Sequence, residues 1–212
     1  MLPATNAAAF ALSALVLIVV PGPSVLFVIG RSLSLGRRGG FLSVLGNSLG
    51  TLPVIAAVAL GVGAVVAESV VVFTIIKIAG SLYLVYLGVQ AVRHRNAHTE
   101  VNAANDTRAS SLRLLREGFL VGITNPKVVV FFVAVLPQFV SYEAGAIPLQ
   151  LALLGLIFVA IALACDIVWA FTAGTARTWF ARNPKRLSHM GAGGGVMMIG
   201  LGGTLVLTGN KN

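Results

Sequence analysis

Long apolar stretches alternate with short polar ones along the whole chain. The predominantly apolar stretches cover about residues 6–29, 41–66, 70–92, 115–140, 147–173 and 189–209. Each reaches the roughly 20 residues that a helix needs to cross the hydrocarbon core of a bilayer. A transmembrane β-barrel would instead show short segments of alternating polarity. The pattern therefore predicts an all-α integral membrane protein with six transmembrane helices, numbered spans one to six below.

The composition favours a single membrane domain that covers residues 1–212. Of the 212 residues, 57% are hydrophobic and only 10% are charged, whereas soluble domains carry about 25% charged residues. Cys165 is the single cysteine, which rules out an internal disulfide and a thiolate cluster for a metal. We therefore expect no cofactor and no metal site.

Basic residues gather in three of the connections between spans. They are Arg31, Arg37 and Arg38 after span one, Arg93, Arg95, Arg108, Arg113 and Arg116 after span three, and Arg177, Arg182, Lys185 and Arg186 after span five. Because short cytoplasmic loops are enriched in Lys and Arg, the pattern predicts a multi-pass protein of the bacterial inner membrane with both termini in the periplasm. It also accounts for the net charge of +9 without a nucleic-acid partner. The first ten residues carry no positive side chain, so we interpret span one as a retained helix rather than a cleaved signal peptide.

The longest polar segment, at about residues 93–114, divides the spans into two sets of three. The first set covers about residues 1–92 and the second about residues 115–212. Two sets with an odd number of spans run through the membrane in opposite directions, which is the arrangement of an inverted repeat. The segment that starts at Pro23 weakly resembles the segment that starts at Pro126, in agreement with such a repeat.

Prolines interrupt spans one and four. Span one contains Pro21, Gly22 and Pro23, and span four contains Asn125 and Pro126. A proline inside a helix removes one backbone N–H and leaves an upstream carbonyl without its partner. At membrane depth such backbone is tolerated where it is buried in protein or lines a watery cavity. Two broken spans in corresponding places therefore predict a transporter with its substrate site between the breaks, near the midplane of the membrane.

Away from the span ends, three charged residues lie within the spans, namely Lys77, Lys127 and Asp166. Each costs about 2.5–3.5 kcal/mol at a helix centre on insertion scales, so each needs a reason to be there. Lys77 either reaches the membrane surface with its long side chain or belongs to the transport pathway. We expect Lys127, directly after the second break, to face the cavity and attract a substrate carboxylate. Asp166 either forms a structural ion pair or handles a proton or an ammonium group.

Glycines four residues apart mark several spans, which places them on one helix face and allows close helix packing. Gly46 and Gly50 flank Asn47 in span two, and the same spacing recurs at Gly118 and Gly122. Packing is the simpler interpretation of these glycines. Asn47 and its neighbour Ser48 offer hydrogen bonds to a polar substrate as well.

Together these motifs resemble the LysE/RhtB family of amino-acid exporters, the homoserine, threonine and lysine efflux type. The segments that carry the resemblance are PGP at 21–23, GNSLG at 46–50, KIAGSLYLVYLG at 77–88, GFLVGITNPK at 118–127 and LPQF at 136–139. The resemblance covers nearly the whole chain, and the glycine-rich last span is the part least like the family. It implies a secondary transporter that exports amino acids or close derivatives from the cytoplasm, coupled to proton entry. The amino acid itself is not readable from these motifs.

Other classes of protein receive less support from the sequence. A metal-cation exporter of a related branch would need several carboxylate, histidine or thiolate ligands, and away from the span ends Asp166 and Cys165 alone qualify. An enzyme is not expected, because no set of catalytic residues is visible. A membrane scaffold or sensor that transports nothing remains open, as does assembly into a homo-oligomer. The expected partners are the lipid bilayer, a small amino acid and protons.

Overall fold

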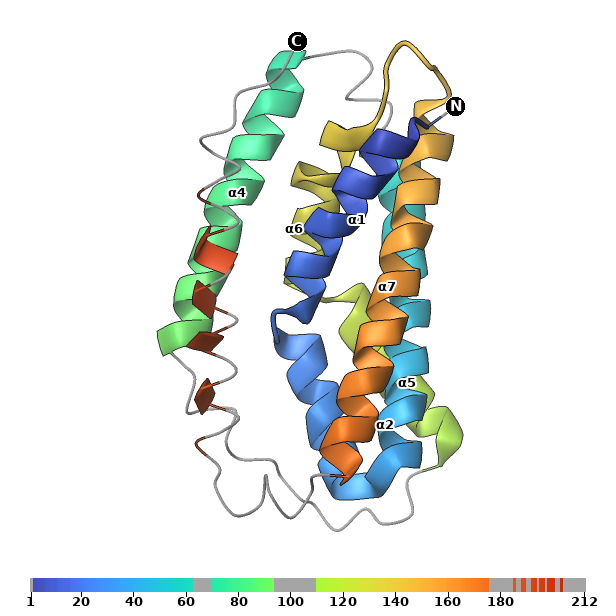
Figure 1. The fold of residues 1–212 in the computed structure, drawn as a ribbon, viewed down its shortest axis with the longest axis vertical. Coiled ribbons are helices and arrows are strands. Elements are labelled where there is room, and N and C mark those ends of the chain that lie inside the picture. The colour runs from blue at the N-terminus through green and yellow to red at the C-terminus, as the bar shows by residue number, and fades with distance from the viewer. Residues whose placement is uncertain are drawn as a thin grey trace.

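The computed structural model describes residues 2–62, 70–93 and 110–175, with scattered positions between 185 and 203. Within this part of the chain all regular elements are helical (Figure 1). They are α1 (Ala4–Val19), α2 (Pro23–Ala57), the π-helix η1 (Val58–Val62), α4 (Val70–Arg93), α5 (Ser111–Ile123), α6 (Pro126–Ala134), the 3₁₀-helix η3 (Leu136–Phe139) and α7 (Ile147–Thr175). Most of the predicted sixth span and of the polar segment 93–114 lies outside the described residues.

Span one is broken as predicted. The helix α1 ends at Val19, the next residues are extended, and α2 begins at Pro23 with Gly22 as its N-cap. Proline fits the first position of a helix, where its missing N–H costs no intrahelical hydrogen bond. The first predicted span therefore consists of α1 and the beginning of α2.

The connection between spans one and two differs from the prediction. The basic residues Arg31, Arg37 and Arg38 lie within α2 rather than in a loop. The one interruption is Gly36, whose φ of 72° and ψ of −173° separate a first limb, residues 23–35, from a second limb, residues 37–57. Glycine adopts positive φ without a steric penalty, so a single residue reverses the chain at the lower end of Figure 1.

Span four is broken as well. The helices α5 and α6, the latter with η3, meet at an angle of 42°. Asn125 is the N-cap of α6, and its side-chain oxygen accepts a hydrogen bond from the backbone N–H of Lys127. By length and composition Pro23–Gly61, which runs through the reversal at Gly36 into η1, and α7 are each long and apolar enough to cross a membrane, and α5 with α6 and η3 forms a third, bent candidate. The all-helical class and both breaks are thus confirmed, whereas the full set of six spans and its inverted repeat remain predictions.

The glycines of α2 and α5 allow these helices to touch through their backbones. A Cβ atom on Gly46 would collide with the carbonyl oxygen of Leu115, and one on Gly50 with that of Phe119. Conversely, a Cβ atom on Gly122 would collide with the carbonyl oxygen of Asn47. The predicted packing role of these glycines is confirmed, and the close approach brings Asn47 next to the break that follows α5.

An aromatic core fills one end of the bundle. Phe10 of α1, Phe131 and Phe132 of α6 and Phe158 of α7 are buried together, with Phe139 of η3 at their edge. The rings of Phe132 and Phe158 meet edge to face at 4.8 Å between centroids, a favourable aromatic geometry. This core lies between α1, α6 and α7, on the far side of the breaks from the first limb of α2 (Figure 1).

Candidate functional site

The two helix breaks hydrogen-bond to each other. Asn125, from the break of span four, donates its side-chain amide to the hydroxyl of Ser24 in the first turn of α2 at 3.1 Å. Lys127 donates from Nζ to the carbonyl oxygen of Val20, in the break of span one, at 2.7 Å. Breaks more than 100 residues apart in the sequence are therefore joined directly.

Lys127 is enclosed where the two breaks meet. Its residue is only 5% exposed, so its side chain does not reach the membrane surface. The ammonium group lies at the C-terminal end of α1, where the free carbonyls and the helix dipole favour a cation. A Cβ atom on Gly22 would lie 3.0 Å from Cδ and 3.3 Å from Nζ of Lys127. The absent side chain of Gly22 thus leaves room for Lys127.

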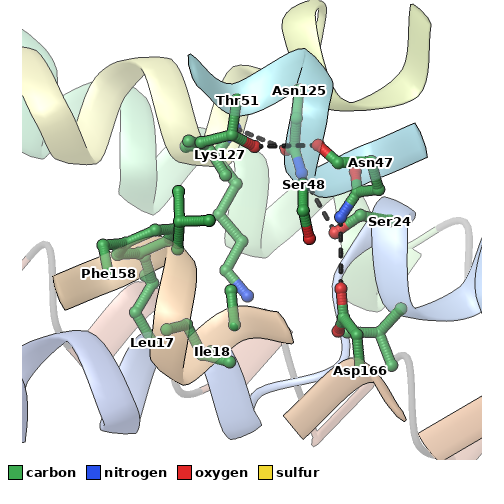
Figure 2. Close-up of a pocket in the computed structure, with 14 residues that line it drawn as sticks. Leu17, Ile18, Ser24, Asn47, Ser48, Thr51, Asn125, Lys127, Phe158 and Asp166 are labelled. Carbon is green, nitrogen blue, oxygen red and sulfur yellow. Dashed lines mark hydrogen bonds between the residues drawn. The ribbon is translucent and has the colours of Figure 1, made fainter. Parts of the chain in front are cut away.

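A small cavity adjoins the breaks (Figure 2). Its volume is about 30 Å³, which is room for about two water molecules. Polar side chains line one part of it, and apolar side chains from α1, α2, α6 and α7 line the rest. The lining residues are Ser24, Asn47, Ser48, Thr51, Asn125, Lys127 and Asp166, with Leu17, Ile18, Val25, Val128, Phe158, Val159 and Ala162.

Asp166 enters the cavity from α7. It is 3% exposed, and its Oδ2 accepts a hydrogen bond of 3.1 Å from the side-chain amide of Asn47. Asn47 is itself 7% exposed, and its own Oδ1 has no hydrogen-bond partner among the described residues. The hydroxyl of the neighbouring Ser48 is likewise buried without a partner in that part of the chain. The polar part of the cavity therefore contains two unsatisfied oxygen atoms beside a carboxylate.

Lys127 and Asp166 line the same cavity from α6 and α7, and Figure 2 shows both side chains directed towards its interior. Both residues are described, and no ion pair within 4.0 Å joins them. Lys127 contacts a backbone carbonyl, and Asp166 contacts an amide. The structure thus presents one cation and one carboxylate to the cavity as separate groups rather than as a closed pair.

The structure brings together most of the residues that the sequence singles out. Asn47, Asn125, Lys127 and Asp166 line the cavity. Pro21, Pro23 and Pro126 lie in the breaks, where they shape the backbone but do not line the cavity. Lys77 lies on α4, and its side chain lies outside the described residues.

Sequence reasoning missed Ser24, Thr51 and Phe158, which line the cavity too. Two of them carried a usable signal. The weak internal match pairs Pro23-Ser24 with Pro126-Lys127, so Ser24 occupies the position equivalent to Lys127. Thr51 lies one helical turn after Asn47, to whose carbonyl oxygen it donates a hydrogen bond. Phe158 carried no such signal in the sequence, because a phenylalanine in an apolar span is indistinguishable from a core residue.

Glu117 is a further residue that the sequence analysis did not single out. This residue of α5 forms an ion pair with Arg31 of the first limb of α2, and it accepts a hydrogen bond of 2.9 Å from Arg113 Nε. The guanidinium of Arg31 also lies over the ring of Phe27. The cluster ties the first limb of α2, the second half of broken span one, to α5, the first half of broken span four, away from the aromatic core.

The described residues offer little to a metal ion. Among them, no three His, Cys, Asp or Glu side chains come together. A metal-cation exporter therefore receives no support from this part of the chain.

Broken helices that meet at a buried, charged cavity, in a bundle of helices long and apolar enough to cross a membrane, define a multi-pass membrane translocator. The chain belongs to the LysE type translocator family, because the sequence model of that family matches residues 15–209. It is therefore a transporter rather than an enzyme.

Several proteins resemble the chain along most of its length. An uncharacterized membrane protein of Vibrio cholerae is 34% identical over 195 residues, which are 92% of this chain and 93% of the relative. The uncharacterized membrane protein YrhP of Bacillus subtilis is 28% identical over 89% of this chain and 92% of its own. The leucine efflux protein of Salmonella choleraesuis is 25% identical over 86% of this chain and 85% of its own. No solved structure matches the chain.

Proposed function

We propose that the protein exports amino acids from the cytoplasm across the bacterial inner membrane. The observation that carries the proposal is the cavity between the breaks, to which Lys127 and Asp166 each present a charge without pairing. A free amino acid carries one carboxylate and one ammonium, so its two charges match the two charges of the cavity. Family membership and the leucine efflux protein among the relatives support the same function.

The apolar lining favours an amino acid with an uncharged side chain. Asp166 is the one carboxylate and Lys127 the one cation among the described lining residues, and both are used by the α-ammonium and α-carboxylate groups. A charged substrate side chain would then be buried without a partner, at a high cost in free energy. Leucine is therefore the first substrate to test, and lysine is expected to be a poor one.

Proton antiport is the proposed mode of coupling. A carboxylic acid carries a proton when neutral and releases it when charged, and Asp166 is the one carboxyl group among the described residues that line the cavity. In this scheme Asp166 takes up a proton from the periplasm when the substrate leaves. It returns the proton to the cytoplasm before the next substrate binds. Both termini are periplasmic in this scheme, in keeping with the three basic connections on the cytoplasmic side.

Transport requires the cavity to enlarge. Its volume of about 30 Å³ holds water but not a leucine molecule. The helices around the breaks must therefore separate on one side of the membrane at a time. The hydrogen bonds between the breaks and the Arg31–Glu117 ion pair are the contacts that such a motion would release.

The proposal is tested by transport in inverted membrane vesicles. Vesicles with the protein should accumulate labelled leucine when their interior is acidified, and vesicles without the protein should not. A panel that includes threonine, homoserine and lysine tests the preference for uncharged side chains. Absence of transport for every amino acid would leave the scaffold or sensor alternative in its place. Transport that is indifferent to the proton gradient would remove antiport but keep export.

A further inference from the structure

Two buried oxygen atoms in the cavity lack hydrogen-bond partners among the described residues. They are Oδ1 of Asn47 and Oγ of Ser48, neighbours on the second limb of α2. A buried polar atom left without a partner destabilises the protein, and such atoms are uncommon in native proteins. Asn125, by contrast, bonds through both its amide nitrogen and its oxygen. The unsatisfied atoms of the cavity thus belong to consecutive residues, the first of which donates to Asp166.

The orientation of the Asn47 amide follows from its neighbour. A charged carboxylate only accepts hydrogen bonds, so the amide nitrogen of Asn47 must face Asp166, as it does at 3.1 Å. The amide oxygen must then point elsewhere, and it remains an acceptor in need of a donor. Ser48 offers a second acceptor from the next position on the helix.

We propose that Asn47, Ser48 and Asp166 together bind the ammonium group of the substrate. An α-ammonium has three N–H donors and a positive charge, which match two neutral acceptors and one carboxylate. This inference rests on the proposed function, because it identifies where one end of an exported amino acid is held. It adds Ser48 as a binding residue and gives Asn47 a definite role.

The opposite end of the substrate is then held at the break of span one. The side chain of Asn125 caps α6 by accepting the backbone N–H of Lys127. Gly22 gives α2 no such side-chain cap, and Pro23 has no N–H, so after the backbone bond from Leu26 to Gly22 the N–H groups of Ser24 and Val25 are left to an anion. The Lys127 ammonium lies against Gly22 and has one acceptor among the described residues, Val20. The two breaks therefore differ, and the substrate carboxylate binds at the first.

The test compares two serine variants of one helix in proteoliposomes. Ser48→Ala removes an acceptor of the cavity, whereas Ser43→Ala removes a buried, unsatisfied hydroxyl that does not line the cavity. With the neutral amino acid that wild type transports best, leucine being expected, Ser48→Ala should raise KM about 10-fold. Ser43→Ala should leave KM unchanged, and both variants should reach wild-type yield.

A substrate analogue identifies which end of the substrate is affected. The 2-hydroxy acid that corresponds to leucine keeps the carboxylate and lacks the ammonium. Its inhibition constant should be the same in wild type and Ser48→Ala, and Asn47→Ala should behave like Ser48→Ala. An unchanged KM in Ser48→Ala, or an equal loss for leucine and the hydroxy acid, would overturn the assignment while amino-acid transport by wild type still stands. If wild type transports no amino acid, the proposed function and this inference fail together.

Discussion

Gly22 and Lys127 depend on each other at the scale of single residues. A methyl group on Gly22 would lie 3.0 Å from Cδ and 3.3 Å from Nζ of Lys127, closer than side chains normally pack. We expect Gly22→Ala to displace the ammonium from the Val20 carbonyl and to lower the export rate several-fold. Because Lys127 is a flexible side chain, the folded yield should change little. Export and yield of the variant are measured in the same vesicle preparation.

Gly30→Ala is the matched control for this prediction. Gly30 lies in the limb of α2 that Gly22 caps, but a Cβ atom there would have no neighbour within 4 Å. It should export at the wild-type rate. If Gly22→Ala exports as fast as Gly30→Ala, the space that Gly22 leaves for the Lys127 side chain has no role in transport.

Asp166 and Lys127 can be separated by comparing yield, net export and exchange. Because no ion pair joins them in the described structure, single neutral variants should fold with near-wild-type yield. Asp166→Asn should lose export driven by a proton gradient and retain exchange of substrate for substrate, which moves no net proton. Lys127→Met should weaken both activities by reducing substrate affinity.

A structural ion pair would give a different pattern. Each single variant would then leave a buried charge unpaired, at a cost of about 3–5 kcal/mol, and yield would fall. The folded yield would recover in the variant that combines Asp166→Asn with Lys127→Met. If Asp166→Asn still exported at the full rate in a proton gradient, Asp166 would not be the group that carries the coupled proton.

The residues of the site that could be predicted from the sequence are those whose side chain or backbone is unusual inside a membrane. Lys127, Asp166 and the prolines stand out because charge and broken backbone are costly in lipid. Ser24 and Thr51 were missed because hydroxyl residues satisfy themselves within helices, as Thr51 does, and are common there. The unsatisfied oxygen of Asn47 could not be foreseen, since it depends on which neighbours the fold supplies.

At the scale of elements, α2 and α5 are held by backbone contact at their glycines. We expect Gly46→Ala to destabilise the protein, because its Cβ atom would meet the carbonyl oxygen of Leu115 and the Cα of Gly118. Backbone atoms cannot move aside as a side chain can, so the cost should be about 1–3 kcal/mol or more. The variant should show a lower unfolding temperature in detergent and a lower folded yield.

Gly61→Ala controls for the intrinsic effect of replacing glycine in a helix. A Cβ atom on Gly61, in η1, has no neighbour within 4 Å. Alanine is favoured over glycine in helices by roughly 0.5–1 kcal/mol, so this variant should be neutral or slightly stabilised. Equal unfolding temperatures for the two variants would contradict the packing argument.

The elements were predictable except where a single residue decides their ends. The length of the apolar stretches predicted the helices, and the prolines predicted both helix breaks. The reversal between the two limbs of α2 was expected to be a loop, since three arginines lie in it. The helix instead continues on both sides of Gly36, because one glycine with positive φ is enough to turn it. Sequence patterns of polarity do not distinguish a polar helix end from a loop.

At the scale of the whole molecule, the orientation in the membrane follows from the basic connections. Arg38, the segment 96–108 and Lys185 should all lie in the cytoplasm. Reporter fusions after Arg38, within 96–108 and after Lys185 should give cytoplasmic signals, and fusions near Glu143 should give a periplasmic one. A periplasmic signal within 96–108 would contradict the predicted six spans and their inverted repeat.

The contacts on the two sides of the cavity differ in kind. Towards the aromatic core, α1, α6 and α7 pack through buried rings such as Phe10, Phe131 and Phe158. Away from it, Arg31 and Glu117 join the first limb of α2 to α5 by an ion pair between partly exposed side chains. Exposed ion pairs are worth little free energy, about 0–1 kcal/mol, so this side is the easier one to open. It is also the side of the basic residues, which is the cytoplasmic side in the predicted topology and the side of substrate entry in the proposed function.

The last prediction tests whether the Arg31–Glu117 contact separates during export. Cys165 is the one native cysteine, so Arg31→Cys and Glu117→Cys can be combined in a Cys165→Ala background and joined by a short bis-thiosulfonate reagent. The cross-link should abolish export, and a reductant should restore it, because the cytoplasmic side can no longer open. Each single cysteine variant, treated in the same way, should keep exporting. Undiminished export by the cross-linked protein would show that substrate enters by another route, with the first limb of α2 and α5 moving as one body.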